Sequence, residues 1–459
     1  MAVYSIIEKL KLEGAQRIDA EYYQPEYLEN DKIIKNYKSG FRFLGDLLKR
    51  KNAITGGATP LGADYPDSGI PFLRVQNVMP NYLDLSDVVY ISEDIHTGSL
   101  RRSRLKVGDV LLTITGVSYG KSATIPWGFK EGNINQHSVK IEVDDTIVLP
   151  EFLSTFFNSR FGKYQNDRKI TGLSRPGLVY TELKNILIPL ISLENQRQIR
   201  ETIVEANETL KKSEVFYSQA EDLLLYELGL KDFKPEDDLV SIVNLSHIKS
   251  ANRMDADYFQ PKYDAAIARI KRHNLKPVKE LVTMKKGFEP GSEEYREEGK
   301  VFFRVSNISK LGFTDKEHKY LSIELYQKLK NNFEPKNGEI LLTKDATPGI
   351  AYVLKEPVEG IIAGGIMRLM GKKDINSEYL ALCINSLVCQ MQVERDAGGS
   401  IIIHWKPEQI KNLLIPILSK SSQQKIADLV YKSHEARKKA KELLEEAKKK
   451  VEKLIEERG

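Results

Sequence analysis

Cysteine is scarce in this sequence. The only two, Cys383 and Cys389, lie six positions apart, and no histidine stands near them at ligand spacing. This pattern indicates neither a disulfide framework nor a zinc site. We therefore expect no bound metal.

Long apolar runs are also lacking. Runs such as 186–191 are too short to cross a bilayer, and the N-terminal stretch MAVYSIIEKLKLEG reaches charged residues before a signal-peptide core is complete. We expect no membrane span, no secretion and a cytoplasmic location. A chain of 459 residues with 41% hydrophobic content is nevertheless long enough for roughly two to four packed domains.

Two catalytic signatures are missing as well. The sequence has no Pro-Pro pair, so it lacks the Asn/Asp-Pro-Pro-aromatic loop of amino-methyltransferases, and it has no glycine-rich cofactor loop. Residues 116–122 end in Gly-Lys-Ser but have only three residues between the glycines, with Thr115 where a phosphate loop has its first glycine. We expect a chain that is not itself an enzyme.

What the sequence does contain is an internal repeat. Residues 15–27 return as 251–263, displaced by 236 positions, and the displacement later becomes 230 and then 227. The order of matching residues is preserved, which indicates a duplicated domain together with its tail. At displacement 230 the identical residues of the first copy are Gly57, Pro60, Tyr65, Gly69, Phe72, Arg74, Val75, Asn77, Gly108, Leu111, Leu112 and Thr113.

Each copy has the pattern of an α+β domain with a mostly β core. Short β-rich runs such as 71–75 and 110–114 alternate with turn residues, and a helical stretch over 151–164 precedes a strand over 185–190. Each copy then ends in long helical periodicity, over 196–230 and 423–457. The predicted domains are 1–194, a spacer helix 195–231, 232–420 and a second spacer helix 421–459.

The two long helices each carry an apolar stripe with alternating spacings of three and four residues, which is typical of a coiled-coil seam. The two stripes could pair with each other, or each helix could pack on its own domain. The seam residues are Ile199, Ile203, Leu210, Tyr217 and Leu224 in the first helix, and Ile426, Val430, Leu444, Val451 and Leu454 in the second.

The whole chain resembles the specificity subunits of type I restriction-modification enzymes. The segments that carry the resemblance are 69–77, 108–113, 171–176, 183–189 and 194–196, repeated in part at 302–307, 338–343, 413–416 and 423–424. The resemblance implies two target-recognition domains that each read one half of a bipartite double-stranded DNA site. It also implies that two antiparallel coiled-coil helices separate these domains and bind two methyltransferase subunits.

The resemblance further implies restriction and translocase subunits as partners, with S-adenosylmethionine, ATP and Mg bound by partner subunits and no cofactor bound by this chain. The copies diverge in two expected reading loops, because Thr59 becomes Glu289 and the run 172–175 becomes 399–402. Because the copies differ in these loops, DNA reading can be assigned to the loops more readily than to individual residues.

The candidate DNA-binding residues are polar side chains beside turns. Asparagine, glutamine and serine suit base edges, lysine suits phosphates, and arginine offers a bidentate donor. His404 and Trp405 are candidates too, although a lone histidine is more often structural. The complete set is Gln76, Asn77, Lys121, Lys169, Ser174, Arg175, Lys285, Lys286, Ser306, Asn307, His404 and Trp405.

We therefore interpret the chain as a DNA-binding specificity subunit that recognises a bipartite site and directs methyltransferase and restriction subunits to it. The alternative is a non-catalytic scaffold whose duplicated domains bind partner proteins. The net charge of +5 is compatible with either function.

Overall fold

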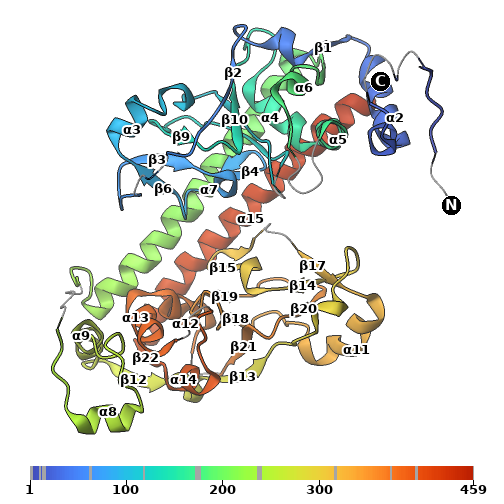
Figure 1. Ribbon diagram of the computed structural model, residues 1–459. Coiled ribbons are helices and arrows are strands. Elements are labelled where there is room, and N and C mark those ends of the chain that lie inside the picture. The colour runs from blue at the N-terminus through green and yellow to red at the C-terminus, as the bar shows by residue number, and fades with distance from the viewer. Residues whose placement is uncertain are drawn as a thin grey trace. The chain divides into compact units, whose positions relative to one another are not determined.

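The computed structural model describes residues 4–9, 12, 17–60, 62, 65–116, 119–170, 177–234, 240–314, 318–372, 375–398 and 402–457. The chain divides into two compact units (Figure 1). The first unit comprises Met1–Lys211 with Arg437–Gly459, and the second comprises Lys212–Ala436. Both mix helices and sheets, which confirms the α+β class. The bounds of the four segments expected from the sequence stay a prediction.

The first unit is built on a four-stranded antiparallel sheet in the order β2-β10-β7-β8. A three-stranded sheet of order β6-β3-β9 accompanies it, in which β3 runs antiparallel to β6 and parallel to β9. Two pairs, β4-β5 and β1-β11, complete the strands of this unit. The bounds are β1 Phe41–Phe43, β2 Ile54–Gly56, β3 Ile70–Leu73, β4 Val78–Met79, β5 Tyr82–Leu83, β6 Val89–Ile91, β7 Val110–Thr113, β8 Ser122–Thr124, β9 Asn133–Ile134, β10 Ser138–Ile141 and β11 Leu187–Pro189.

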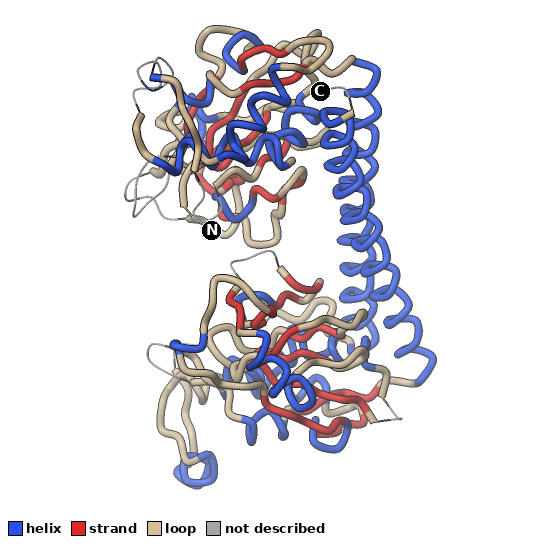
Figure 2. The backbone as a smooth tube through the Cα atoms, turned by 90° about the vertical axis from the view of Figure 1, so that its right-hand side faces the viewer, coloured by secondary structure: helices blue, strands red, loops and turns tan. Residues whose placement is uncertain are grey.

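The second unit repeats this topology strand for strand. Its sheets have the orders β13-β21-β18-β19 and β17-β14-β20, with the pairs β15-β16 and β12-β22. Figure 2 shows the strands of each unit gathered in its interior with helices and loops around them. The bounds are β12 Asn274–Pro277, β13 Val282–Lys286, β14 Lys300–Phe303, β15 Ile308–Ser309, β16 Gly312–Phe313, β17 Lys319–Leu321, β18 Ile340–Thr343, β19 Ala351–Val353, β20 Gly360–Ile362, β21 Ile366–Gly371 and β22 Leu414–Ile417.

Each unit also contains short helices. In the first unit they are η1 Ala20–Tyr23, α2 Pro25–Lys35, η2 Leu44–Leu47, η3 Val75–Asn77, α3 Glu93–Thr97, η4 Arg101–Ser103, α4 Pro150–Asn158, α5 Arg160–Lys169 and α6 Tyr180–Lys184. In the second unit they are α8 Leu245–Ala251, α9 Pro261–Ile270, α10 Val278–Leu281, η5 Ser292–Glu294, η6 Val305–Asn307, α11 Ile323–Phe333, α12 Ser377–Asn385, α13 Leu387–Asp396 and α14 Pro407–Asn412.

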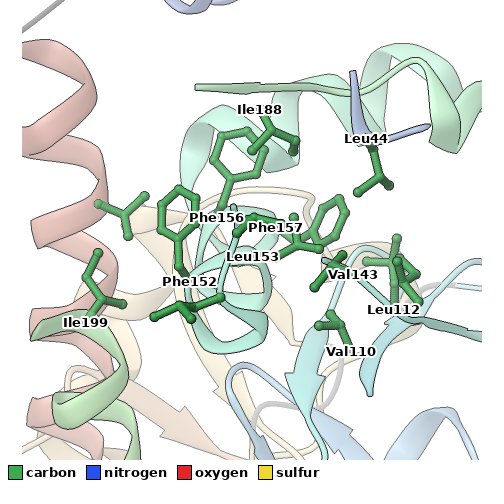
Figure 3. Packing of buried hydrophobic residues seen from close by; sticks show 14 of the residues in the cluster. Leu44, Val110, Leu112, Val143, Phe152, Leu153, Phe156, Phe157, Ile188 and Ile199 are labelled. Carbon is green, nitrogen blue, oxygen red and sulfur yellow. The ribbon is translucent and has the colours of Figure 1, made fainter. Parts of the chain in front are cut away.

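Helix α4 forms the centre of the core of the first unit. Phe152 and Phe157 are almost completely buried, as are their neighbours on the same helix. Phe152 points towards Ile199, while Phe157 lies on the side of Val143 and Leu112 (Figure 3). Helix α4 therefore contacts both the sheet and the long helices. Burial of each large apolar side chain contributes about 1.5–3 kcal/mol to the stability of this core.

The two long helices are α7 (Leu193–Leu228) and α15 (Lys420–Glu456). In the first unit, Lys439 Nζ lies 2.8 Å from Glu205 Oε1 and Lys450 Nζ lies 2.8 Å from Gln198 Oε1. Residues later in α15 contact residues earlier in α7, so the paired portions of the two helices are antiparallel. The expected pairing of the two helices is confirmed within this unit.

The second unit shows the same pairing. Ser433 Oγ donates to the carbonyl oxygen of Ser213 at 2.7 Å, and Ser422 Oγ donates to Glu227 Oε2 at 3.2 Å. The predicted seam residues are buried with one correction: Leu454 is only half-buried, and Ile455 takes the buried position at the end of the seam. No helix among the described residues is long and apolar enough to cross a membrane.

One helix differs in length between the two units. Ser92 and Ser322 occupy equivalent positions and cap α3 and α11, with the serine Oγ accepting from the backbone amide three residues later at 3.4 and 3.2 Å. Gly98 ends the shorter helix, whereas Lys328 stands at the corresponding position and the longer helix continues. The residues after Gly98 are thereby free to form η4.

Candidate nucleic-acid interface

Two of the proposed base-reading residues have structural roles. Asn77 and Asn307 are fully buried. Asn77 Oδ1 accepts from the Arg74 amide at 2.9 Å, and its Nδ2 donates to the Asp84 carbonyl oxygen at 2.9 Å. Asn307 Oδ1 accepts a hydrogen bond from the Arg304 amide at 3.0 Å. These side chains hold η3 and η6 in place, so their expected contact with bases is not supported.

The neighbouring residues Gln76 and Ser306 are exposed. Gln76 Nε2 donates to Asp87 Oδ2 at 2.7 Å, and Arg74 Nη2 donates to the carbonyl oxygen of Asp87 at 2.8 Å. Asp87 thus holds the side chains of Arg74 and Gln76 on one side of the turn. Gln76 and Ser306 remain DNA-contact candidates because their side chains are accessible.

The lysines expected to contact phosphates in the first unit are less accessible. Lys169 at the end of α5 has a side chain only 12% exposed, and its Nζ lies 3.0 Å from Glu182 Oε2. The ion pair with Glu182 therefore neutralises the charge of Lys169 without DNA. Lys121, just before β8, is half-buried. Ser174 and Arg175 lie outside the described residues.

In the second unit, Lys285 and Lys286 end strand β13 and are both exposed. Lys286 Nζ lies 2.9 Å from Glu289 Oε2 in a solvated ion pair, which contributes little and can exchange for a phosphate. The structure therefore leaves both lysines available at this strand end.

His404 and Trp405 lie next to each other but in different environments. His404 is exposed, and its Nδ1 lies 2.8 Å from Asp345 Oδ1. Burial acts to raise the pKa of Asp345, but hydrogen bonds from Lys344 and His404 outweigh it and lower that pKa. Trp405 is only 1% exposed and belongs to the core of the second unit, so the expected DNA contact of Trp405 is wrong.

The seam residues proposed to bind partners are likewise occupied inside the chain. Ile199, Leu210 and their neighbours pack in the core of the first unit, and Leu224 and Ile426 pack in that of the second. A partner on α7 or α15 must use outward residues instead. Val215, Tyr226 and Tyr431 are the large exposed hydrophobic residues there.

A basic groove in the first unit was missed by the sequence-based selection. It encloses about 1150 Å³ between β2, η4 and the loop before β9. Its charged lining residues are Arg50, Lys51, Arg101, Arg102, Arg104, Lys106, Lys130, Glu131, Lys140 and Glu142. Basic side chains greatly outnumber the carboxylates, which is typical of a surface that binds phosphates.

The buried part of the groove is electrically balanced. Lys140 Nζ lies 3.5 Å from Asp109 Oδ2 and 3.4 Å from Glu142 Oε1, and Arg50 Nη2 lies 2.6 Å from the same glutamate oxygen. Burial raises the pKa of Asp109, with attraction to Lys140 opposing the shift. For Glu142, burial is outweighed by the hydrogen bond from Arg50 and the attraction of Lys140, and the pKa is lowered.

The outer part of the groove is not balanced. Six exposed cations have no ion pair within the described part of the chain, namely Lys51, Arg101, Arg102, Arg104, Lys106 and Lys130. The repeat replaces three of the arginine positions by Asn331, Asn332 and Glu334. The groove therefore belongs to the first unit in particular. Its signal in the sequence is the run Arg-Arg-Ser-Arg-Leu-Lys over 101–106.

One segment of the chain, which lies mostly in the second unit, matches a known family model. Residues 272–447 match the family model described as the type I restriction modification DNA specificity domain. These residues are similar to such a DNA specificity domain. The match confirms the resemblance inferred from the motifs. The strands of the first unit follow the same order as those of the second.

A curated relative points the same way. The chain is 26% identical over 172 residues to the EcoBI specificity subunit of a type I restriction enzyme from Escherichia coli, an alignment that covers 38% of this chain and 35% of the relative. The match thus spans about a third of the relative's length.

Two solved structures of S subunits align with most of the chain. An S subunit of a type I restriction-modification system from M. genitalium has a TM-score of 0.40 at 12% identity, covering 90% of this chain and 94% of that one. The HsdS subunit from Thermoanaerobacter tengcongensis has a TM-score of 0.27 at 15% identity, covering 90% and 96%.

Proposed function

We propose that this chain is the DNA specificity subunit of a type I restriction-modification system. In this role it recognises a bipartite DNA site, one half with each unit, and directs methyltransferase and restriction subunits to it. The observation that carries the proposal is that residues 272–447 match a DNA specificity domain and that the first unit repeats the strand order of the second.

The basic groove supports a nucleic-acid function over the scaffold alternative. A protein-binding scaffold has no need for six exposed cations around one groove that form no ion pair with the described residues, whereas a duplex carries closely spaced phosphates that such cations neutralise. Sequence discrimination would come from the exposed turns. Each good bidentate base contact is worth about 1–3 kcal/mol, so several contacts in each unit reach the roughly 4–10 kcal/mol between specific and non-specific binding.

Specificity subunits are generally non-catalytic, and we extend this to the present chain. S-adenosylmethionine, ATP and Mg then bind to the methyltransferase and restriction partners. The carboxylates that open β7 and β18 fit this view. Glu339 forms a buried bidentate pair with Arg368 at 2.7 and 2.9 Å, and Asp109 pairs with Lys140, so both carboxylates serve the fold.

The test is reconstitution with the methyltransferase subunit. The complex is expected to methylate DNA at one split motif, while the chain alone transfers no methyl group. Methyl transfer by the chain alone would contradict the non-catalytic role. Absence of salt-dependent DNA binding by the complex would favour the scaffold.

A further inference from the structure

Each copy of the repeat begins with the same exposed apolar segment. The displacement of 236 that aligns the two copies pairs Tyr4 with Val240 and Ile6 with Ile242. Their exposures are 80% and 78% for the first pair and 91% and 99% for the second. Large hydrophobic side chains exposed at equivalent positions in both copies indicate a shared binding role. We call residues 4–7 and 240–243 the two arms.

The backbone of both arms is unpaired. Among the described residues, no hydrogen bond involves the main chain of residues 4–7 or 240–243, and neither segment has regular secondary structure. The arm sequences are Tyr-Ser-Ile-Ile and Val-Ser-Ile-Val, whose exposed first and third residues would share one face of a strand, and both arms are rich in β-branched residues. Free amides and carbonyls on such a segment are a template for strand pairing.

The chain after each arm is fixed by an identical clamp. Arg17 Nη2 lies 2.7 Å from Asp19 Oδ1, and Arg253 Nη2 lies 2.8 Å from Asp255 Oδ1. Each aspartate also accepts from the backbone amide three residues later, at 3.2 and 3.1 Å. The free segment therefore precedes a fixed point at the same place in both units.

We propose that each arm adds a strand to an exposed sheet edge of a partner subunit, so that one chain binds two copies of the same partner. Strand addition uses main-chain hydrogen bonds for affinity and alternate side chains for fit. The arms carry no charged side chain, so DNA phosphates are not their ligand. This inference rests on the proposed function, under which the partner that each arm binds is one methyltransferase subunit.

The test uses proline, which removes an amide donor and is excluded from paired positions of a strand. The variants are Ser5→Pro, Ser241→Pro and both together, with Ser68→Pro in an exposed loop of the first unit as the matched control. Complexes with the methyltransferase subunit are sized by sedimentation. Each single variant is expected to bind one methyltransferase tightly, with the other site weakened about tenfold or more, and the double variant is expected to show the same weakening at both sites.

The side chains are tested separately by Ile6→Ser with Ile242→Ser, which should weaken both sites while the thermal midpoint stays unchanged. If the double proline variant binds two methyltransferase subunits as tightly as the control, strand addition is wrong while the DNA function stands. If the arms instead mediate self-association of the chain or binding to phosphatidylcholine vesicles, the assigned partner is wrong. Loss of DNA binding by the wild-type complex would refute the proposed function itself.

Discussion

Removing charge from the basic groove should change the salt dependence of DNA binding by a calculable amount. The variant replaces Arg101, Arg102 and Arg104 by glutamine, which keeps the side chains polar while removing three unpaired cations. Each phosphate contact contributes about 0.9 to the slope of log affinity against log salt. The slope should therefore fall by about 3. Between 50 and 200 mM salt, the wild-type complex should lose about fortyfold more affinity than the variant.

The assay is fluorescence anisotropy of the complex with the methyltransferase subunit, on its own target and on a scrambled duplex of equal length. The control replaces Lys35, Lys38 and Arg42, which are exposed in the same unit, so that net charge changes equally. Phosphate contacts are blind to sequence, so the groove variant should weaken both duplexes alike. Equal slopes for the groove variant and the control would refute the assignment.

Three further predictions concern the stability of the units. Phe152→Ala should destabilise the fold by about 3–5 kcal/mol, measured by denaturant unfolding, whereas Phe43→Ala at an exposed position should have little effect. Arg368→Leu leaves Glu339 buried without its partner and should cost about 3–5 kcal/mol, and a loss below 1 kcal/mol would contradict a closed pair. The pKa of Asp345 is lowered in the folded protein. The stabilisation that this carboxylate contributes is therefore present above its unfolded pKa and is lost as pH falls through the folded pKa. Asp345→Asn should flatten the acid limb of a plot of thermal midpoint against pH.

The duplicated architecture could be predicted because the repeat preserves the residues that shape the backbone. Gly108 and Gly338 precede equivalent strands with φ of +86° and +84°, a conformation that favours glycine. The long helices could also be predicted, because the spacing of their seam residues is maintained over many turns. The seam ends one residue later than expected because Ile455 faces the core.

The DNA-contact residues were harder to predict, for a chemical reason. An asparagine amide presents the same donor and acceptor to a backbone turn as to an adenine edge, so Asn77 and Asn307 looked like readers although they hold turns. The basic groove was missed because its cations come from separate segments around residues 50, 101–106 and 130 that only the fold brings together.

The most direct test of the central claim is methylome sequencing after a half-exchange. Residues 20–190 of this chain are replaced by the same region of a related specificity subunit, and the hybrid is expressed with the methyltransferase partner. If each unit reads one half of the site, the methylated motif should change in one half and keep the other half unchanged. A motif that changes in both halves, or in neither, would contradict the account.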